Sequence, residues 1–153
     1  MKSSLIYFLF IIFLSLHTLL NVKANEPFVF NVTEIEILEN GNQINGYKGG
    51  TAVTEDGSKI IAENFYFNKL TNILEAEGNV KYLDGIKNTI ITTDKAIYMK
   101  NQEKIFTKGN SKAMSEDGSK IIAENFYFNK LTNILEAEGN VKYLDGIKNT
   151  IIT

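Results

Sequence analysis

The feature that most constrains this chain is an internal repeat without a mismatch. Residues 55–92 recur unchanged as residues 116–153, at an offset of 61. Each 61-residue unit is itself two diverged halves, because Ile60-x-Ala62-x-x-Phe65-x-Phe67 corresponds to Ile91-x-Thr93-x-x-Ala96-x-Tyr98 at an offset of 31. A fainter copy begins at Val32. Units of this size cannot bury an apolar face alone, so we expect them to stack around one continuous core.

Apolar and polar residues alternate within each unit, as in a β-strand with one buried face. The pattern is clearest where apolar and polar positions follow each other as Leu74, Glu75, Ala76, Glu77, Gly78, Asn79, Val80, Lys81 and Tyr82. Between Ala62 and Phe65 the phase slips by one residue, which predicts a β-bulge at Glu63-Asn64. No helix is predicted after residue 24. The predicted fold is therefore all-β, a jelly-roll-like stack of repeated strand pairs with roughly eight strands of typical length.

Turn signals separate the strands at regular intervals. Asn-Gly and Asp-Gly dipeptides accept the positive φ angles of tight turns, and they occur at Asn40-Gly41, Asp56-Gly57, Asp84-Gly85, Asp117-Gly118 and Asp145-Gly146. Residues 68–72 and 129–133 are predicted as longer turns. Asp56 and Asp84 are accordingly interpreted as turn residues and not as metal ligands.

The N-terminus has the order of a secretory signal peptide. Lys2 precedes an apolar run over residues 5–20, and Val22-Lys23-Ala24 places small residues for cleavage after Ala24. We therefore expect residues 1–24 to be a signal peptide, an uncleaved membrane anchor being the alternative, and residues 25–153 to be one domain. The column that holds Val32 and its copies would next fall at position 154, so we expect the domain to continue beyond this sequence.

Composition excludes most catalytic chemistry. The chain has no Cys, and its one His, His17, lies in the N-terminal apolar run. From residue 25 onward there is also no Arg and no Trp, which removes Ser-His-Asp and Cys-His catalysis, histidine-bound zinc and arginine phosphate clamps. That part has 14 Lys against 18 Asp and Glu, a net charge of −4 without a basic stripe for nucleic acid. We predict a protein without enzymatic activity, cofactor or metal.

Isolated charged residues do not change that prediction. Glu75 and Glu77 lie two apart on one strand face, whereas a glycosidase pair must flank a bond from separate elements. They are interpreted as solvated acids on the polar face. The lysines are scattered along polar faces and are interpreted as a solvated surface.

The motif I-x-A-x-x-F-x-F-N followed by L-x-A-x-G-N-V resembles the OstA-like family. That family includes the periplasmic lipopolysaccharide-transport protein LptA and the N-terminal domain of the outer-membrane lipopolysaccharide-assembly protein LptD. The resemblance covers residues 28–153 in four units, with Gly78-Asn79-Val80 and Gly139-Asn140-Val141 matching and Lys48-Gly49-Gly50 departing from the pattern. LptD-type members usually carry cysteines in this region, and none occurs here.

The resemblance implies a β-jelly roll opened like a folded taco, with lipopolysaccharide acyl chains in its groove. It implies edge-to-edge docking with other jelly-roll domains of the Lpt type, and a location in the periplasm or at the outer membrane of a Gram-negative bacterium. The function it implies is lipopolysaccharide transport to the outer membrane, without a cofactor. Movement must be driven from elsewhere, since the chain has no Walker motif.

The inward column of each unit supplies the candidate lipid-binding residues. They are Ile60, Ala62, Phe65, Phe67, Leu74, Ala76, Val80, Tyr82, Tyr98, Ile105, Ile121, Ala123, Phe126, Phe128, Leu135, Ala137, Val141 and Tyr143. Small residues at fixed inward positions leave room between two sheets, which favours a groove. The same alternation also suits an ordinary sandwich core. A repeat-built exported adhesin or structural protein with a dry β-core is therefore the alternative function.

Overall fold

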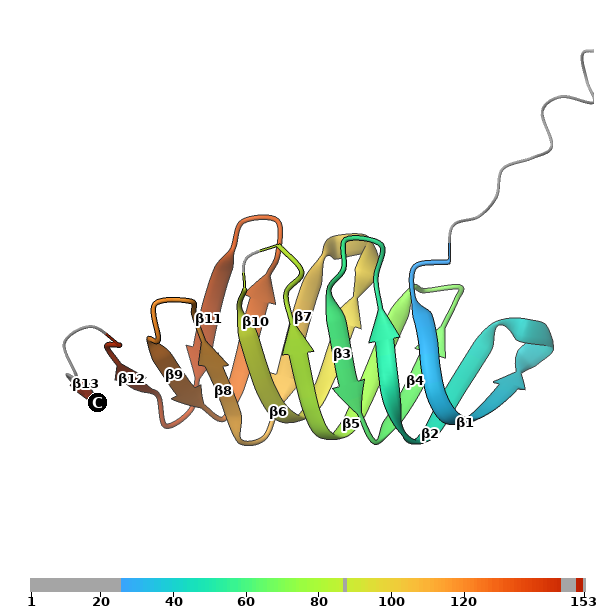
Figure 1. The fold of residues 1–153 in the computed structure, drawn as a ribbon, viewed down its shortest axis with the longest axis horizontal. Helices are drawn as coiled ribbons and strands as arrows, with labels where there is room; N and C mark the ends of the chain where they lie inside the picture. Colours follow the sequence, from blue (N-terminus) through green and yellow to red (C-terminus); the bar gives the residue numbers. More distant parts are fainter. Residues whose placement is uncertain (1–25, 87, 147–150, 153) are drawn as a thin grey trace, which may run out of the picture.

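The computed structural model describes residues 26–86, 88–146 and 151–152, so the predicted signal peptide lies outside the described residues. The strands stack side by side along one axis, from β1 at one end to β13 at the other (Figure 1). Thirteen strands are assigned in the described part, all paired antiparallel where they pair, together with two short 3-10 turns, η2 (Glu39–Gly41) and η3 (Lys100–Gln102). None of the helical segments in the described part is long and apolar enough to cross a membrane.

The stack has two walls that share a corner. Four long strands pass through both walls: β1 (Val29–Leu38), β2 (Gln43–Val53), β5 (Ile73–Leu83) and β6 (Ile90–Met99). The front wall, nearer the viewer in Figure 1, is completed by β3 (Lys59–Ala62), β8 (Ser111–Met114), β9 (Lys120–Ala123), β12 (Lys142–Leu144) and β13 (Ile151–Ile152). The back wall is completed by β4 (Asn64–Asn68), β7 (Lys104–Lys108), β10 (Asn125–Asn129) and β11 (Ile134–Glu138).

Each Gly-Asn dipeptide of the repeat lies at the corner. Gly78 has φ 80° and Asn79 φ 48°, so two successive residues in the left-handed region turn β5 from the back wall to the front wall. A Cβ on Gly78 would come within 2.5 Å of a Glu63 carboxylate oxygen. The Asn79 side chain donates to the Glu63 carboxylate at 2.6 Å, and Asn110 to Asp94 and Asn140 to Glu124 repeat this bond along the corner.

The first unit makes the same corner with a different sequence. Lys48 and Gly49 have φ 60° and 83°, so the departure from Gly-Asn-Val does not change the backbone path. The predicted bulge at Glu63-Asn64 is a break at the corner, where Glu63 separates β3 from β4. Because every such break divides one chain segment into two strands, the strand number exceeds the eight that we predicted.

The Asp-Gly turns line the rim, which is the edge of the walls opposite the corner. Gly57 and Gly118 have the predicted positive φ angles of 81° and 84°. Gly85 does not have a positive φ. A glycine is needed there because the backbone of the neighbouring turn approaches closely, and a Cβ would lie 2.5 Å from the carbonyl oxygen of Asp56. The two front-wall turns after β2 and β5 are thus packed against each other.

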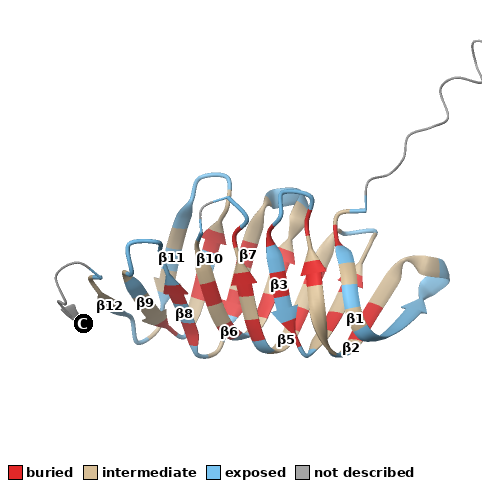
Figure 2. Cartoon of the chain, viewed as in Figure 1, coloured by how far each residue is buried: buried red, intermediate tan, exposed pale blue. Residues whose placement is uncertain are grey.

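Buried residues recur along the strands of both walls (Figure 2). Their side chains form one cluster in the space between the walls, which we call the trough. The core is one cluster that runs along the stack, including Phe65, Phe67, Leu74, Tyr98 and Phe126. No buried side-chain polar atom within the described ranges lacks a hydrogen-bond partner.

Candidate functional site

Cross-strand register aligns the inward residues into continuous rows. On the back wall, one row follows the pairs of Ile44 with Phe67, Phe67 with Leu74 and Leu74 with Tyr98, and continues through Ile105, Phe128 and Leu135. On the front wall, the corresponding row follows Ala52, Ile60, Tyr82, Ile91, Ala113, Ile121 and Tyr143. The trough is therefore lined by apolar and aromatic side chains from both walls.

At its N-terminal end the trough is filled by the protein itself. Phe28, which precedes β1, is buried and packs edge-on against Phe67 at 5.1 Å and Tyr98 at 5.6 Å between ring centroids. Phe30 packs in the same way against Phe65 at 6.1 Å. Aromatic pairs in these geometries add stability beyond the area that they bury. This half of the trough is a dry core.

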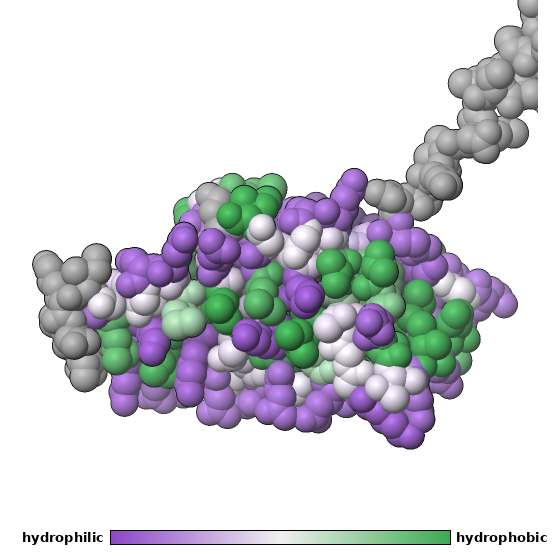
Figure 3. All heavy atoms as spheres, viewed as in Figure 1, coloured by the Kyte–Doolittle hydropathy of each residue, from purple (hydrophilic) through white to green (hydrophobic). Residues whose placement is uncertain are grey.

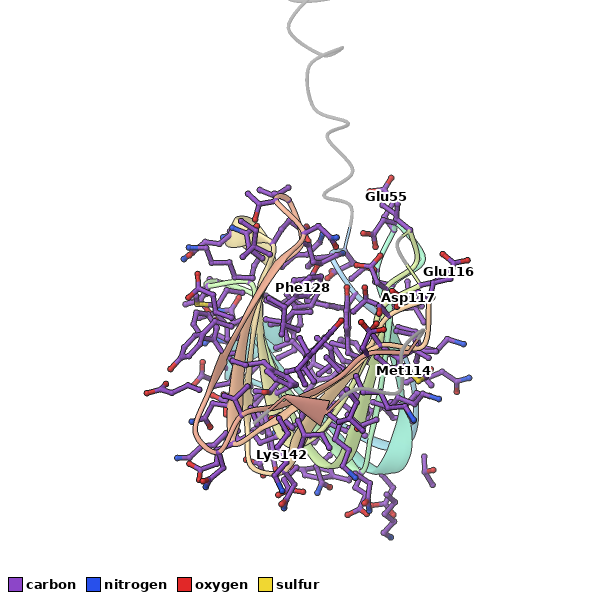
Figure 4. The ribbon with its side chains drawn as sticks, turned by 90° about the vertical axis from the view of Figure 1, so that its left-hand side faces the viewer. Glu55, Met114, Glu116, Asp117, Phe128 and Lys142 are labelled. Carbon is purple, nitrogen blue, oxygen red and sulfur yellow. The ribbon has the colours of Figure 1, made fainter. Side chains whose placement is uncertain are left out.

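At its C-terminal end the trough opens. Val80 is 1% exposed, whereas its copy Val141 is 43% exposed, and Leu135 and Tyr143 are half-buried where Leu74 and Tyr82 are buried. A cavity of about 250 Å³ lies between the walls here. Its lining includes Ala113, Ile121, Phe128, Leu135 and Tyr143. Figure 4 looks along the stack from this end, with Phe128 on one wall and Asp117 near the rim of the other.

A lysine from the back wall ties the two rims together at the middle of the stack. Lys130 follows β10, and its side chain is only 6% exposed. Its Nζ donates to Asp56 Oδ2 at 2.6 Å and Ser58 Oγ at 3.1 Å, both on the front wall. It also donates to the Tyr98 hydroxyl at 3.1 Å and lies 3.4 Å from Glu103 Oε2. We call this group of Lys130, Asp56, Ser58, Tyr98 and Glu103 the rim clasp.

The rim clasp changes the acid–base properties of its members. Burial would raise the pKa of Asp56, but hydrogen bonds from Lys130, Thr54 and the Ser58 backbone outweigh it, and the pKa lies well below its usual range. The pKa of Glu103 is also lowered. Burial would raise it, but hydrogen bonds from Lys100 and Tyr98 outweigh that effect. Burial, and then the hydrogen bond to Glu103, raise the pKa of Tyr98. The clasp therefore holds ionised carboxylates against a charged lysine and a neutral phenol.

A second polar group supports the clasp from the front wall. The Tyr82 hydroxyl donates to Asp84 Oδ2 at 3.0 Å, and the Ser58 hydroxyl accepts from the Gly85 amide at 3.2 Å. Burial is the main cause that raises the pKa of Tyr82. Asp84 is buried and also accepts from the Ile86 amide at 2.8 Å. Asp56 and Asp84 are thus turn residues, as predicted, that also hold the rim together.

The exact copies of these residues are arranged differently. Lys69 and Lys130 have the same neighbours in sequence. Their backbone amides also make equivalent bonds, because Lys69 donates to the carbonyl of Asn42 and Lys130 to the carbonyl of Glu103. The Lys69 side chain instead pairs with Glu26 at 2.9 Å on the surface. Asp117 accepts from the hydroxyl of Ser115 at 2.5 Å and the amide of Ser119 at 3.0 Å. The clasp therefore forms once within the described ranges.

The structure places seventeen of the eighteen candidate residues on the inward faces of the walls, and Val141 lies exposed just before β12. Thirteen of them are buried: Ile60, Ala62, Phe65, Phe67, Leu74, Ala76, Val80, Tyr82, Tyr98, Ile105, Ala123, Phe126 and Phe128. Ile121, Leu135, Ala137 and Tyr143 are half-buried, and Val141 is exposed. The accessible members therefore gather at the C-terminal end.

Sequence reasoning missed Phe28 and Lys130. Phe28 stands before the first recognisable unit, so no repeat marked it as inward. Our interpretation of every lysine as solvated is wrong for Lys130, because a partner 74 residues away buries it. No local signal could have distinguished it from Lys69.

The chemistry available in the trough is binding. The inward faces offer hydrocarbon, phenol and hydroxyl groups, and the charged groups of the rim clasp are paired with one another. In the described part of the chain, no three His, Cys, Asp or Glu side chains gather where they could hold a metal ion.

Two antiparallel walls that share a corner and enclose an apolar trough define an open β-jelly roll. Among solved structures, this chain is similar to LptH from Pseudomonas aeruginosa, the LptA-homologous periplasmic component of its lipopolysaccharide transport device. The TM-score is 0.67 at 13% sequence identity, over 74% of this chain and 83% of LptH. The predicted all-β stack of strand pairs is confirmed, and the fold is LptA-like. No known family profile matches the chain, and no curated protein matches its sequence.

Proposed function

We propose that this chain is a non-enzymatic carrier that binds lipopolysaccharide through its acyl chains and passes it across the periplasm towards the outer membrane. The observation that carries the proposal is the apolar trough that opens at the C-terminal end, around Leu135, Val141 and Tyr143. The LptA-like fold supports it. Membership of the OstA-like family, as an LptA or as the N-terminal domain of an LptD, is part of the same proposal. So is the removal of residues 1–24 on export.

Acyl-chain burial supplies the affinity in this proposal. Each buried CH₂ contributes about 0.8 kcal/mol. The cavity of about 250 Å³ is smaller than the roughly 300–1,000 Å³ of ordinary ligand sites. A lipid with several chains therefore enters only if the walls separate further at the open end. The rim clasp limits that separation, because Lys130 joins the two rims.

Unpaired strand edges at the ends of the stack are the proposed binding sites for protein partners. Strand β11 pairs only with β10 within the described residues, so its other edge has backbone groups free for a further strand. Exposed edges of this kind accept a strand from another chain. We propose that other jelly-roll domains of the Lpt type extend the trough by pairing here.

Photo-crosslinking tests the proposal at neighbouring positions of β11. A photoreactive residue at Leu135 faces the open trough, and one at Glu136 faces outward on the next residue. With purified lipopolysaccharide we expect capture at Leu135 and not at Glu136. A third probe at Leu74, the buried copy of Leu135, should capture far less than the probe at Leu135. Equal capture at Leu135 and Glu136 in folded variants contradicts lipid binding in the trough.

The filled N-terminal half favours one other function. Phe65, Leu74 and Tyr98 are fully buried among protein side chains, as in a structural β-protein with a dry core. The same three probes distinguish this function, because a dry structural core yields no lipid adduct at any of them.

A further inference from the structure

The outward face of the front wall has one sign of charge. Strand alternation points five lysines to the outside of this wall: Lys59, Lys81, Lys112, Lys120 and Lys142. None of them has a carboxylate within ion-pair distance in the described structure. No acidic residue occupies an outward position of the described front-wall strands. We call this surface the lysine face.

Aliphatic side chains separate the lysines. The outward positions between them are filled by Ile61, Leu83, Ile90, Met114, Ile122 and Leu144. Along one row the register pairs Lys81 with Thr92, Lys112 with Ile122 and Ile122 with Lys142. Lysines two strands apart are about 10 Å from each other. Figure 3 shows the result as green apolar areas interrupted by purple polar ones across this side of the molecule.

The opposite wall has the reverse charge. Its outward glutamates are Glu34, Glu36, Glu75, Glu77, Glu136 and Glu138. Lys95, one of the outward lysines there, is neutralised by Glu75 at 2.6 Å and Glu77 at 2.8 Å. A chain with net charge −2 thus separates its charges across the two walls. Such a distribution orients a protein towards an anionic partner.

The lysine face is also hollowed along the corner. Lys81, Lys112, Lys142 and Ile122 line a shallow concavity of about 810 Å³. The carboxylates at its lower border, Asp94 and Glu124, accept hydrogen bonds from Asn110 and Asn140 at 2.7 and 2.6 Å. The hollow therefore has three lysines, on long and flexible side chains, against two carboxylates at the corner, and its net charge is positive.

We propose that the lysine face docks the domain on the surface of an anionic lipid bilayer. The ammonium groups contact lipid phosphates, and the aliphatic residues between them enter the headgroup region, where apolar groups are buried and lysines extend to the charged layer. The aliphatic residues favour a bilayer over an anionic polysaccharide, which offers hydrated groups on every side. The proposal does not depend on lipid transport through the trough.

Vesicle flotation with residues 25–153, the exported form proposed above, tests this inference with matched charge changes. The double variant Lys112→Gln/Lys142→Gln removes two charges from the lysine face. The control Lys104→Gln/Lys108→Gln removes two outward lysines without an ion pair from the back wall. On phosphatidylcholine vesicles that contain phosphatidylglycerol, each lysine near the surface contributes about fivefold in affinity. We expect about a 25-fold loss for the first variant and less than about threefold for the control.

The remaining measurements distinguish a bilayer from other possible partners of the lysine face. Ile122→Ser should weaken vesicle binding severalfold even at high salt, which a polysaccharide site would not require. Equal losses for the two double variants, or binding that is independent of phosphatidylglycerol, overturn the proposal. A third result also overturns it. If the wild type does not bind vesicles but self-associates in sedimentation, and the Lys112→Gln/Lys142→Gln variant does not self-associate, the lysine face binds a second copy of the chain. All variants must keep the wild-type unfolding midpoint, so that a loss of binding reports on the surface and not on the fold.

Discussion

Replacing Lys130 with methionine removes the charge of the rim clasp and keeps most of the side-chain volume. The change leaves Asp56 and Glu103 facing each other without their shared cation. Removing one partner of a buried ion pair costs about 3–5 kcal/mol. Because the Asp56 and Glu103 side chains remain 29% and 21% exposed, we expect the lower end, a loss of about 3 kcal/mol in the free energy of unfolding.

Urea unfolding followed by circular dichroism measures this loss, and the repeat supplies a matched control. Lys69→Met changes the same residue in the same local sequence, but Lys69 only pairs with Glu26 on the surface. Surface pairs contribute less than about 1 kcal/mol. The thermal midpoint should fall by roughly 10 °C for Lys130→Met and by only a few degrees for Lys69→Met. Equal losses in the two variants would refute the reasoning.

The pH dependence gives the same experiment a second readout. Asp56 has a lowered pKa in the folded state, so its ionised form stabilises the fold above the unfolded pKa of about 3.9. That contribution is lost as the pH falls towards the folded-state pKa. We expect wild type and Lys69→Met to lose stability steeply below about pH 4, and Lys130→Met to lose less. Parallel acid profiles for all three would exclude the clasp as the cause.

Three further predictions concern the phenols, the corner and the N-terminal segment. Burial raises the pKa of Tyr82, so its neutral form stabilises the fold below the unfolded pKa of about 10; alkaline titration by ultraviolet absorbance should show this tyrosine ionising only as the chain unfolds. Gly78→Ala should cost more than Gly57→Ala, about 1–2 kcal/mol for the positive φ at either site and a further loss from the contact with Glu63 at Gly78 alone; equal losses in urea unfolding would contradict the contact. Phe28→Ala should lower the free energy of unfolding by about 3 kcal/mol, and a near-neutral effect would show that the dry core begins later in the chain.

The alternation of apolar and polar residues determined the strands and their inward faces. It did so because the side-chain period of a strand is two, whatever packs against it. The corner at the Gly-Asn dipeptides was not predicted, because Gly78 and Asn79 fit the alternation of one continuous strand; only the structure shows that both have positive φ, which their residue types adopt at low cost. Lys48-Gly49, which departs from the motif, still makes the corner, so the motif is sufficient for this backbone but not required.

Burial and pairing within the trough were decided by tertiary structure. The two copies of the repeat are identical for 38 residues, yet Val80 is buried and Val141 exposed, and Lys130 joins the rims while Lys69 remains at the surface. The local sequence fixes the direction in which each side chain points. The residues that a side chain contacts depend on the strands on either side of it and on the nearest turn of the opposite wall. Identical sequences at different places in the stack therefore have different partners.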